Sequence, residues 1–290
     1  MPPLRTAALT VVALVAFAGN SLLARTALRD TPIDAMTFTS IRLVSGALIL
    51  AAIAARMRRS PLAEGNWPSA LALFAYAVFF SFAYTAMAAG TGALILFAAV
   101  QATMIGWGLS QGERFRPIQS AGLVLAAGGL ITLMAPGITA PALIPSLAMS
   151  AAGIAWGVYS LRGRRAGHPI VATAGNFLRT VPLSLVGSAV LIAHARPDPA
   201  GVGWAIASGA VASGLGYAIW YAALPGLTAT FAATVQLGVP VIAALGAVLL
   251  LGESLSLRLA VAASAVLGGI AIVILSRRRP PPLTPPRDPR

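Results

Sequence analysis

Aromatic side chains recur at helical spacing in two apolar stretches of the sequence. Tyr76, Phe80 and Tyr84 are four residues apart, which places the three rings on one face of a helix. Tyr217 and Trp220 form a second group at similar spacing. Such rings line binding sites for small organic molecules, but they also pack in protein cores, so the spacing alone leaves both interpretations open.

The amide side chains of Asn20, Gln101 and Gln236 lie deep inside stretches that contain no charged residue. If these stretches cross a membrane, each amide has to face protein or a wet cavity, because hydrocarbon offers it no hydrogen bond. Contacts between helices or contacts with a bound substrate would both satisfy this need.

Two arginines also lie within apolar stretches. Arg42 and Arg179 each follow a proline, Pro32 or Pro169, by ten residues. A buried arginine is costly in lipid, so each must reach water, a carbonyl group or a partner. We interpret both as structural or gating residues that cap or brace their helices, with direct contact to a substrate carboxylate as the alternative.

The composition indicates that most of the chain lies in lipid. The chain has 290 residues, of which 58% are hydrophobic and 9% are charged, whereas soluble domains have about 25% charged residues. The net charge is +13, but the arginines form short clusters between apolar stretches, which is typical of membrane topology and not of nucleic-acid binding. Without cysteine, lysine or a cluster of nucleophile and base, the chain is predicted to be no enzyme and to bind no metal or cofactor.

A transmembrane helix needs about 20 predominantly apolar residues, and charged residues divide this chain into stretches of that length. We predict ten membrane helices, the third and fourth being separated near residues 89–93. They lie in Thr6–Ala24, Ala35–Ala55, Gly65–Gly112 (two), Pro117–Leu161 (two), Ala166–Ala195, Ala200–Gly252 (two) and Leu259–Ser276. The predicted cytoplasmic loops carry more arginine than the outer ones, which predicts that both termini are cytoplasmic.

The two halves of the chain resemble each other. "FAAVQ" (97–101) recurs as "FAATVQ" (231–236), and the spacing from Gly112-Glu113 to Gly128-Gly129 is repeated from Gly252-Glu253 to Gly268-Gly269. We therefore predict a first repeat over residues 1–137, a second over 138–276 and a disordered tail over 277–290. Because each repeat has five helices, the second is inverted in the membrane, a pattern typical of transporters that work by alternating access.

Residues 221–273 resemble the closing helices of the drug/metabolite transporter superfamily, EamA type. "AWGVYSLRGRR" (155–165) and "FLRTVPL" (177–183) resemble the opening helices of its second repeat. The resemblance implies an all-α membrane protein with ten helices in two inverted repeats and a central cavity between them. Within the superfamily the chain is most similar to the YddG-type exporters of aromatic and other neutral amino acids. It departs from the pattern in its fourth helix, which is shorter than the ninth and has no counterpart of Pro240.

The resemblance places several further aromatic residues near the cavity. The set of substrate-binding residues predicted in this way is Asn20, Tyr76, Phe80, Tyr84, Gln101, Trp107, Trp156, Tyr159, Tyr217, Trp220 and Gln236. The fifth and tenth helices, in contrast, contain small residues that predict close helix packing; these are Gly122, Ala126, Gly129, Ser264 and Gly268.

These features predict an exporter of aromatic or other neutral amino acids in the bacterial cytoplasmic (inner) membrane. Its partners would be a small-molecule substrate and the lipid bilayer, without nucleic acid; the oligomeric state stays open, and a monomer is compatible with the sequence. All seven acidic residues lie in loops, at helix ends or in the tail, which predicts no proton antiport through a buried acid. Export of amphiphilic cationic drugs and a scaffold without transport are the alternatives.

Overall fold

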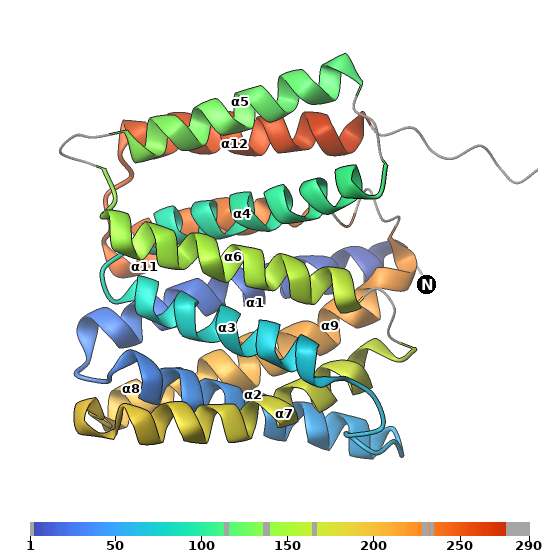
Figure 1. The fold of residues 1–290 in the computed structure, drawn as a ribbon, viewed down its shortest axis with the longest axis vertical. Coiled ribbons are helices and arrows are strands. Elements are labelled where there is room, and N and C mark those ends of the chain that lie inside the picture. The colour runs from blue at the N-terminus through green and yellow to red at the C-terminus, as the bar shows by residue number, and fades with distance from the viewer. Residues whose placement is uncertain are drawn as a thin grey trace, which may run out of the picture.

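The computed structural model describes residues 3–112, 116–135, 140–163, 167–227, 232 and 235–276, and within these residues it is helical without strands (Figure 1). The helices are α1 (Pro3–Asp30), α2 (Ala35–Arg56), α3 (Trp67–Tyr84), α4 (Ala89–Ser110), α5 (Pro117–Met134), α6 (Leu143–Gly163), α7 (Pro169–Val190), α8 (Pro199–Ile206), α9 (Gly216–Ala223), α11 (Gly238–Leu251) and α12 (Leu257–Leu275). A π-helix, η2 (Ala207–Leu215), joins α8 to α9, and two short 3₁₀ helices, η1 (Ile192–His194) and η3 (Leu224–Gly226), follow α7 and α9.

Nine helical segments among the described residues are long and apolar enough to cross a membrane. The segment Pro199–Gly226, which contains α8, η2 and α9, is one of them. The ninth predicted helix corresponds to α11, which is shorter at 14 residues and follows a stretch that the described residues cover only in part. These helices indicate a multi-pass membrane protein, while the count of ten helices stays a prediction. The tail from residue 277 and Glu113 lie outside the described residues.

Helix ends are set by capping residues that the sequence displays. Asp34 caps α2 by accepting hydrogen bonds from the backbone N–H groups of Met36 and Thr37. A second Asp34 oxygen accepts from the N–H of Arg196, which fastens the segment before α8 to the start of α2. Burial raises the pKa of the Asp34 carboxyl, but hydrogen bonds from the Thr37 side chain and from these N–H groups outweigh burial, so the pKa lies below its ordinary value.

The break predicted near residues 89–93 lies slightly earlier in the chain, because α3 ends at Tyr84 and α4 begins at Ala89. The glycines that suggested a break are packing positions inside α4. A methyl group at Gly90 would lie 2.9 Å from the Ala244 side chain, and one at Gly92 would lie 2.5 Å from the Tyr84 ring. Glycine at these sites lets neighbouring elements approach the helix backbone.

The helices run alongside one another across the molecule, and the pair α5 and α12 forms one edge of it (Figure 1). The beginning of α1 and the end of α12 lie at the same end of the helices (Figure 1). We call this the N-terminal end, and the other, where α1 meets α2, the opposite end.

Small residues bring α5 and α12 into close contact. A methyl group at Gly122 would lie 2.7 Å from the carbonyl oxygen of Gly269, and one at Gly129 would lie 2.8 Å from the side chain of Ala265. The predicted close packing of these two helices is therefore confirmed. However, a methyl group at Gly268 would have no neighbouring atom within 4 Å and Ser264 is exposed, so the contact face of α12 is one residue away from the predicted one.

Candidate binding cavity

A cavity of about 390 Å³ lies among α1, α3, α4, α6, η2 and α9. This is within the range of sites that hold small organic molecules. It is lined by Phe17, Asn20, Ser21, Tyr76, Phe80, Leu96, Phe97, Val100, Gln101, Met104, Trp156, Tyr159, Ser160, Gly163, Pro169, Ala212, Ser213, Tyr217, Trp220, Tyr221, Leu224, Ala232 and Gln236. Gly163 and Pro169 are exposed at the N-terminal end, so the cavity reaches the surface there.

The structure brings most of the predicted binding residues together around this cavity. Those in its lining are Asn20, Tyr76, Phe80, Gln101, Trp156, Tyr159, Tyr217, Trp220 and Gln236. Two predicted residues lie outside the lining. Tyr84 packs edge-on against Phe80 and donates its hydroxyl to the carbonyl oxygen of Ala89, while Trp107 is half exposed on the outer surface of α4.

Some lining residues were not predicted from the sequence although helical spacing points to them. Phe17 precedes Asn20 by three residues, and Phe97 precedes Gln101 by four. Each pair shares a helix face, so the polar residue could have identified its apolar neighbour. Ser213, four residues before Tyr217, is a further example.

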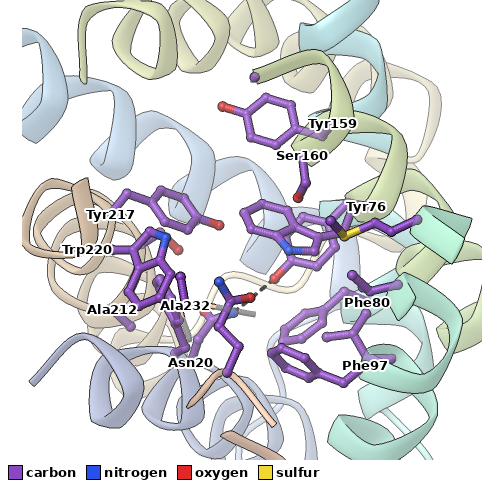
Figure 2. A pocket seen from close by; sticks show the side chains of 18 of the residues that line it. Asn20, Tyr76, Phe80, Phe97, Tyr159, Ser160, Ala212, Tyr217, Trp220 and Ala232 are labelled. Atoms are coloured by element: carbon purple, nitrogen blue, oxygen red, sulfur yellow. Dashed lines mark hydrogen bonds between the residues drawn. The ribbon is translucent and has the colours of Figure 1, made fainter. Parts of the chain in front are cut away.

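Trp156 is the centre of the aromatic lining. Its ring stacks on Tyr217 at a centroid distance of 5.3 Å and an interplanar angle of 20°. It also lies 4.9 Å from the ring of Tyr76 and 5.3 Å from that of Tyr159. Because these rings come from α3, α6 and α9, a flat apolar ligand would contact three separate helices at once (Figure 2).

A chain of polar contacts begins at the hydroxyl of Tyr76. This oxygen accepts one hydrogen bond from Nη2 of Arg42 at 3.0 Å and another from the side-chain nitrogen of Asn20 at 3.3 Å. Figure 2 shows the second bond as a dashed line beside the cavity. The Asn20 side-chain oxygen in turn accepts from Ser208 at 2.7 Å. Three helical elements thus hold the Tyr76 hydroxyl in place.

Arg42 is almost completely buried, with 2% of its surface exposed. Its guanidinium carbon lies 5.2 Å from the centre of the Tyr76 ring and 4.7 Å from that of Phe80, distances at which a cation is attracted by a ring face. Beyond the bond to Tyr76, its Nε and Nη1 atoms have no hydrogen-bond partner within the described part of the chain.

Arg179 has different surroundings, although the sequence places it at the matching position of the second repeat. It is half-buried, and its Nη1 donates to the carbonyl oxygens of Glu64 at 3.1 Å and Gly175 at 3.0 Å. These contacts fasten α7 to the loop before α3, which is a bracing arrangement. The two arginines therefore have unlike environments.

The π-helical stretch η2 forms one wall of the cavity. Ala212 and Ser213 of this stretch line it, and the hydroxyl of the buried Ser213 has no partner among the described residues. A π-helix inside an α-helix is uncommon and occurs often at functional sites. Gly209 permits close packing of η2 on α2, since a side chain there would collide with the carbonyl group of Arg42.

Polar contacts close the opposite end of the helices. Nε of Arg25 donates to one oxygen of Glu253 at 3.1 Å, and the other Glu253 oxygen accepts from the N–H of Ala89 at 2.9 Å. Nη1 of Arg25 also donates to the carbonyl oxygen of Tyr84 at 3.0 Å. We call these four residues the polar latch. It joins α1, the turn between α3 and α4, and the segment after α11.

The cavity lining is mainly apolar and aromatic, with a few polar groups: among its described residues there is neither a carboxylate nor an imidazole. The polar side-chain groups in the lining are hydroxyls, amides and the indole N–H groups of Trp156 and Trp220. Such a set binds and orients a molecule by hydrogen bonding and aromatic contact.

Comparison with known proteins connects this architecture to transport. Residues 143–275 match the EamA-like transporter family. The chain is 53% identical over 279 residues to the uncharacterized protein PA1977 of Pseudomonas aeruginosa, covering 96% of this chain and 97% of that one. It is 27% identical over 259 residues to the aromatic amino acid exporter YddG of Ancylobacter novellus, covering 85% and 88%. A solved crystal structure of a protein 22% identical in sequence shares the fold, with a TM-score of 0.66 over 93% of this chain and 97% of that one.

Proposed function

We propose that this chain, whose residues 143–275 match the EamA-like transporter family, exports aromatic or other neutral amino acids from the cytoplasm through the central cavity. The observation that carries the proposal is the aromatic lining built around Trp156, Tyr76 and Tyr217. Ring contacts of this kind contribute about 0.5–1.5 kcal/mol each beyond the area they bury, which favours a substrate with an aromatic side chain. The similarity to an aromatic amino acid exporter supports the same substrate class.

The two ends of the cavity support transport by alternating access. The lining reaches exposed residues at the N-terminal end, whereas the polar latch and the buried Tyr84 close the opposite end. With both termini in the cytoplasm, this is an inward-open state, and the two inverted repeats (1–137 and 138–276) would rock against each other to open the other side. Breaking the latch is the step that this cycle requires.

A counterflow assay tests the proposal. Liposomes of bacterial lipid containing the purified protein are loaded with unlabelled phenylalanine and diluted into labelled phenylalanine. We expect uptake above that of empty liposomes and competition by tryptophan. If no neutral amino acid exchanges faster than in empty liposomes, the proposed substrate class is refuted.

The same assay separates the alternatives. An exporter of cationic amphiphilic drugs would exchange a lipophilic cation and ignore phenylalanine, and a scaffold would exchange neither. The described cavity lining offers no carboxylate to attract a cation, so we expect lipophilic cations to compete poorly with phenylalanine.

A further inference from the structure

We propose that Arg42 and Tyr76 form a recognition site for the carboxylate of the substrate, so that this cavity selects aromatic carboxylates and makes no use of the amino group. The proposal rests on the proposed function, because it defines the substrate class of the same cavity. It implies that an aromatic acid without an amino group would bind, whereas an aromatic amine without a carboxylate would not.

The hydroxyl of Tyr76 is arranged to donate into the cavity. A tyrosine hydroxyl has two acceptor positions and one proton to donate. Arg42 and Asn20 both donate to its oxygen, so the acceptor positions are taken. The hydroxyl donates to no described residue, and Tyr76 itself lines the cavity. The proton is therefore available to an acceptor on a bound ligand.

The charge of Arg42 makes a carboxylate the favoured acceptor. A buried guanidinium without a counter-charge is costly, and the ring faces of Tyr76 and Phe80 offset only a part of this cost. The ion pairs seen in the described part of the chain lie around Arg25 and Arg29, near the polar latch. An anion that binds at the Tyr76 hydroxyl would supply the missing negative charge, and the guanidinium would strengthen the hydrogen bond from Tyr76.

A purely structural role explains Arg179 and does not explain Arg42. Arg179 is half-buried and donates to two backbone carbonyl oxygens, as expected for a brace between elements. Arg42 donates to no backbone group, and two of its three nitrogens are unpartnered within the described residues. Its one hydrogen-bonded side chain there, Tyr76, lines the cavity.

The lack of a counter-charge in the described cavity lining explains why the amino group would contribute little. Burying an ammonium charge is costly unless a negative charge pairs with it. No carboxylate is present among the described lining residues. The unpartnered hydroxyl of Ser213 gives a second polar contact for the ligand. This hydroxyl can donate to a carboxylate oxygen as readily as it can accept.

Competition with three matched ligands tests the proposal. Phenylalanine, 3-phenylpropanoate and phenethylamine share the phenyl ring and differ in which charged group they carry. Each is added as a competitor of labelled phenylalanine counterflow, and its binding is also measured by thermal stabilisation of the purified protein. We expect 3-phenylpropanoate to compete within about threefold of phenylalanine and phenethylamine to be at least about tenfold weaker, as the loss of a hydrogen bond to a charged group requires.

Two variants assign this preference to residues. Tyr76→Phe keeps the ring that faces Arg42 and removes the hydroxyl, and we expect it to weaken 3-phenylpropanoate about tenfold while leaving phenethylamine unchanged. Arg42→Gln should have the same effect, and Arg179→Gln, the matched control, should lower thermal stability without changing the order of the three ligands. Tyr76→Phe keeps the proposal testable if Arg42→Gln does not fold.

The outcomes separate this proposal from the proposed function. Equal competition by phenethylamine and 3-phenylpropanoate, or equal weakening of both by Tyr76→Phe, would refute the carboxylate site even if phenylalanine is transported. If phenylalanine is not transported but 3-phenylpropanoate stabilises the protein in a manner that depends on Tyr76, the carboxylate site is supported and the proposed function fails.

Discussion

Neutralising Glu253 should open the end of the cavity that the polar latch closes. Glu253 accepts hydrogen bonds from Arg25 and from the N–H of Ala89, and its side chain and that of Arg25 are only 11% and 14% exposed. Hydrogen bonds to a charged group contribute about 1.5–3 kcal/mol each. Glutamine keeps an oxygen for one of the two donors, so Glu253→Gln should cost the closed state about 2 kcal/mol. This corresponds to a shift of about 30-fold towards opening.

The chain has no cysteine, which allows a direct measurement of this shift. Ser21→Cys places one thiol in the cavity lining, four residues before Arg25. A membrane-impermeant maleimide is added to whole cells from the outer face, and the labelling rate is followed in the presence and absence of Glu253→Gln. We expect the second substitution to speed labelling at least about tenfold.

Asp30→Asn is the matched control for this experiment. Asp30 forms an exposed ion pair with its sequence neighbour Arg29 and, among the described residues, contacts no member of the polar latch; because Arg29 itself lies 3.8 Å from Glu253, we expect Asp30→Asn to change the labelling rate far less than Glu253→Gln does. An unchanged rate in Glu253→Gln, or an equal increase in Asp30→Asn, would refute the latch. Slower labelling would indicate that the opposite end faces the cytoplasm.

Three further predictions follow from packing, capping and the cavity wall. Gly269→Ala should lower the free energy of unfolding by about 1–3 kcal/mol, because α5 leaves no room for the methyl group. Gly268→Ala, the control, should be neutral or slightly stabilising. Similar melting temperatures of the two variants would contradict the packing of α5 on α12. Asp34→Ala should lower the free energy of unfolding by about 1 kcal/mol near neutral pH. Because the pKa of Asp34 is lower in the folded state, the difference in melting temperature between variant and wild type should shrink below about pH 4. A difference that stays constant with pH would contradict the capping role. Trp156→Leu should reduce phenylalanine counterflow at least about tenfold. Trp107→Leu, which changes a ring outside the cavity lining, should keep counterflow within about twofold of the wild-type rate. Equal effects of the two substitutions would refute the central position of Trp156.

Helical spacing and the family resemblance predicted much of the cavity lining. Tyr76 and Phe80 share a face of α3, and the ring of Tyr217 on α9 stacks on that of Trp156 on α6. Spacing succeeds here because a helix of known phase places residues three or four apart on one face. Trp107 shows the limit of the method, since its helix borders the cavity while its own face points outwards.

Other features depend on contacts between distant parts of the chain, which local patterns do not contain. Arg42 and Arg179 have matching positions in the two repeats, but only the structure shows that one meets a tyrosine hydroxyl and the other backbone carbonyls. The start of α4 at Ala89 is likewise fixed by Glu253, which is 164 residues away. The predicted phase of α12 is one residue from the observed contact at Gly269, because neighbouring glycines in a sequence do not reveal which one faces a partner.

Substrate protection of a single thiol in the cavity tests most directly the claim that this cavity binds the transported molecule. Ser160→Cys places the thiol in the lining, and Ser110→Cys places one on the exposed surface of α4, outside the lining. We predict that phenylalanine slows maleimide labelling of the Ser160→Cys protein in a saturable manner and has no effect on the Ser110→Cys protein. If phenylalanine is exchanged in the counterflow assay but leaves the labelling of both proteins unchanged, the substrate binds elsewhere and the central claim is contradicted.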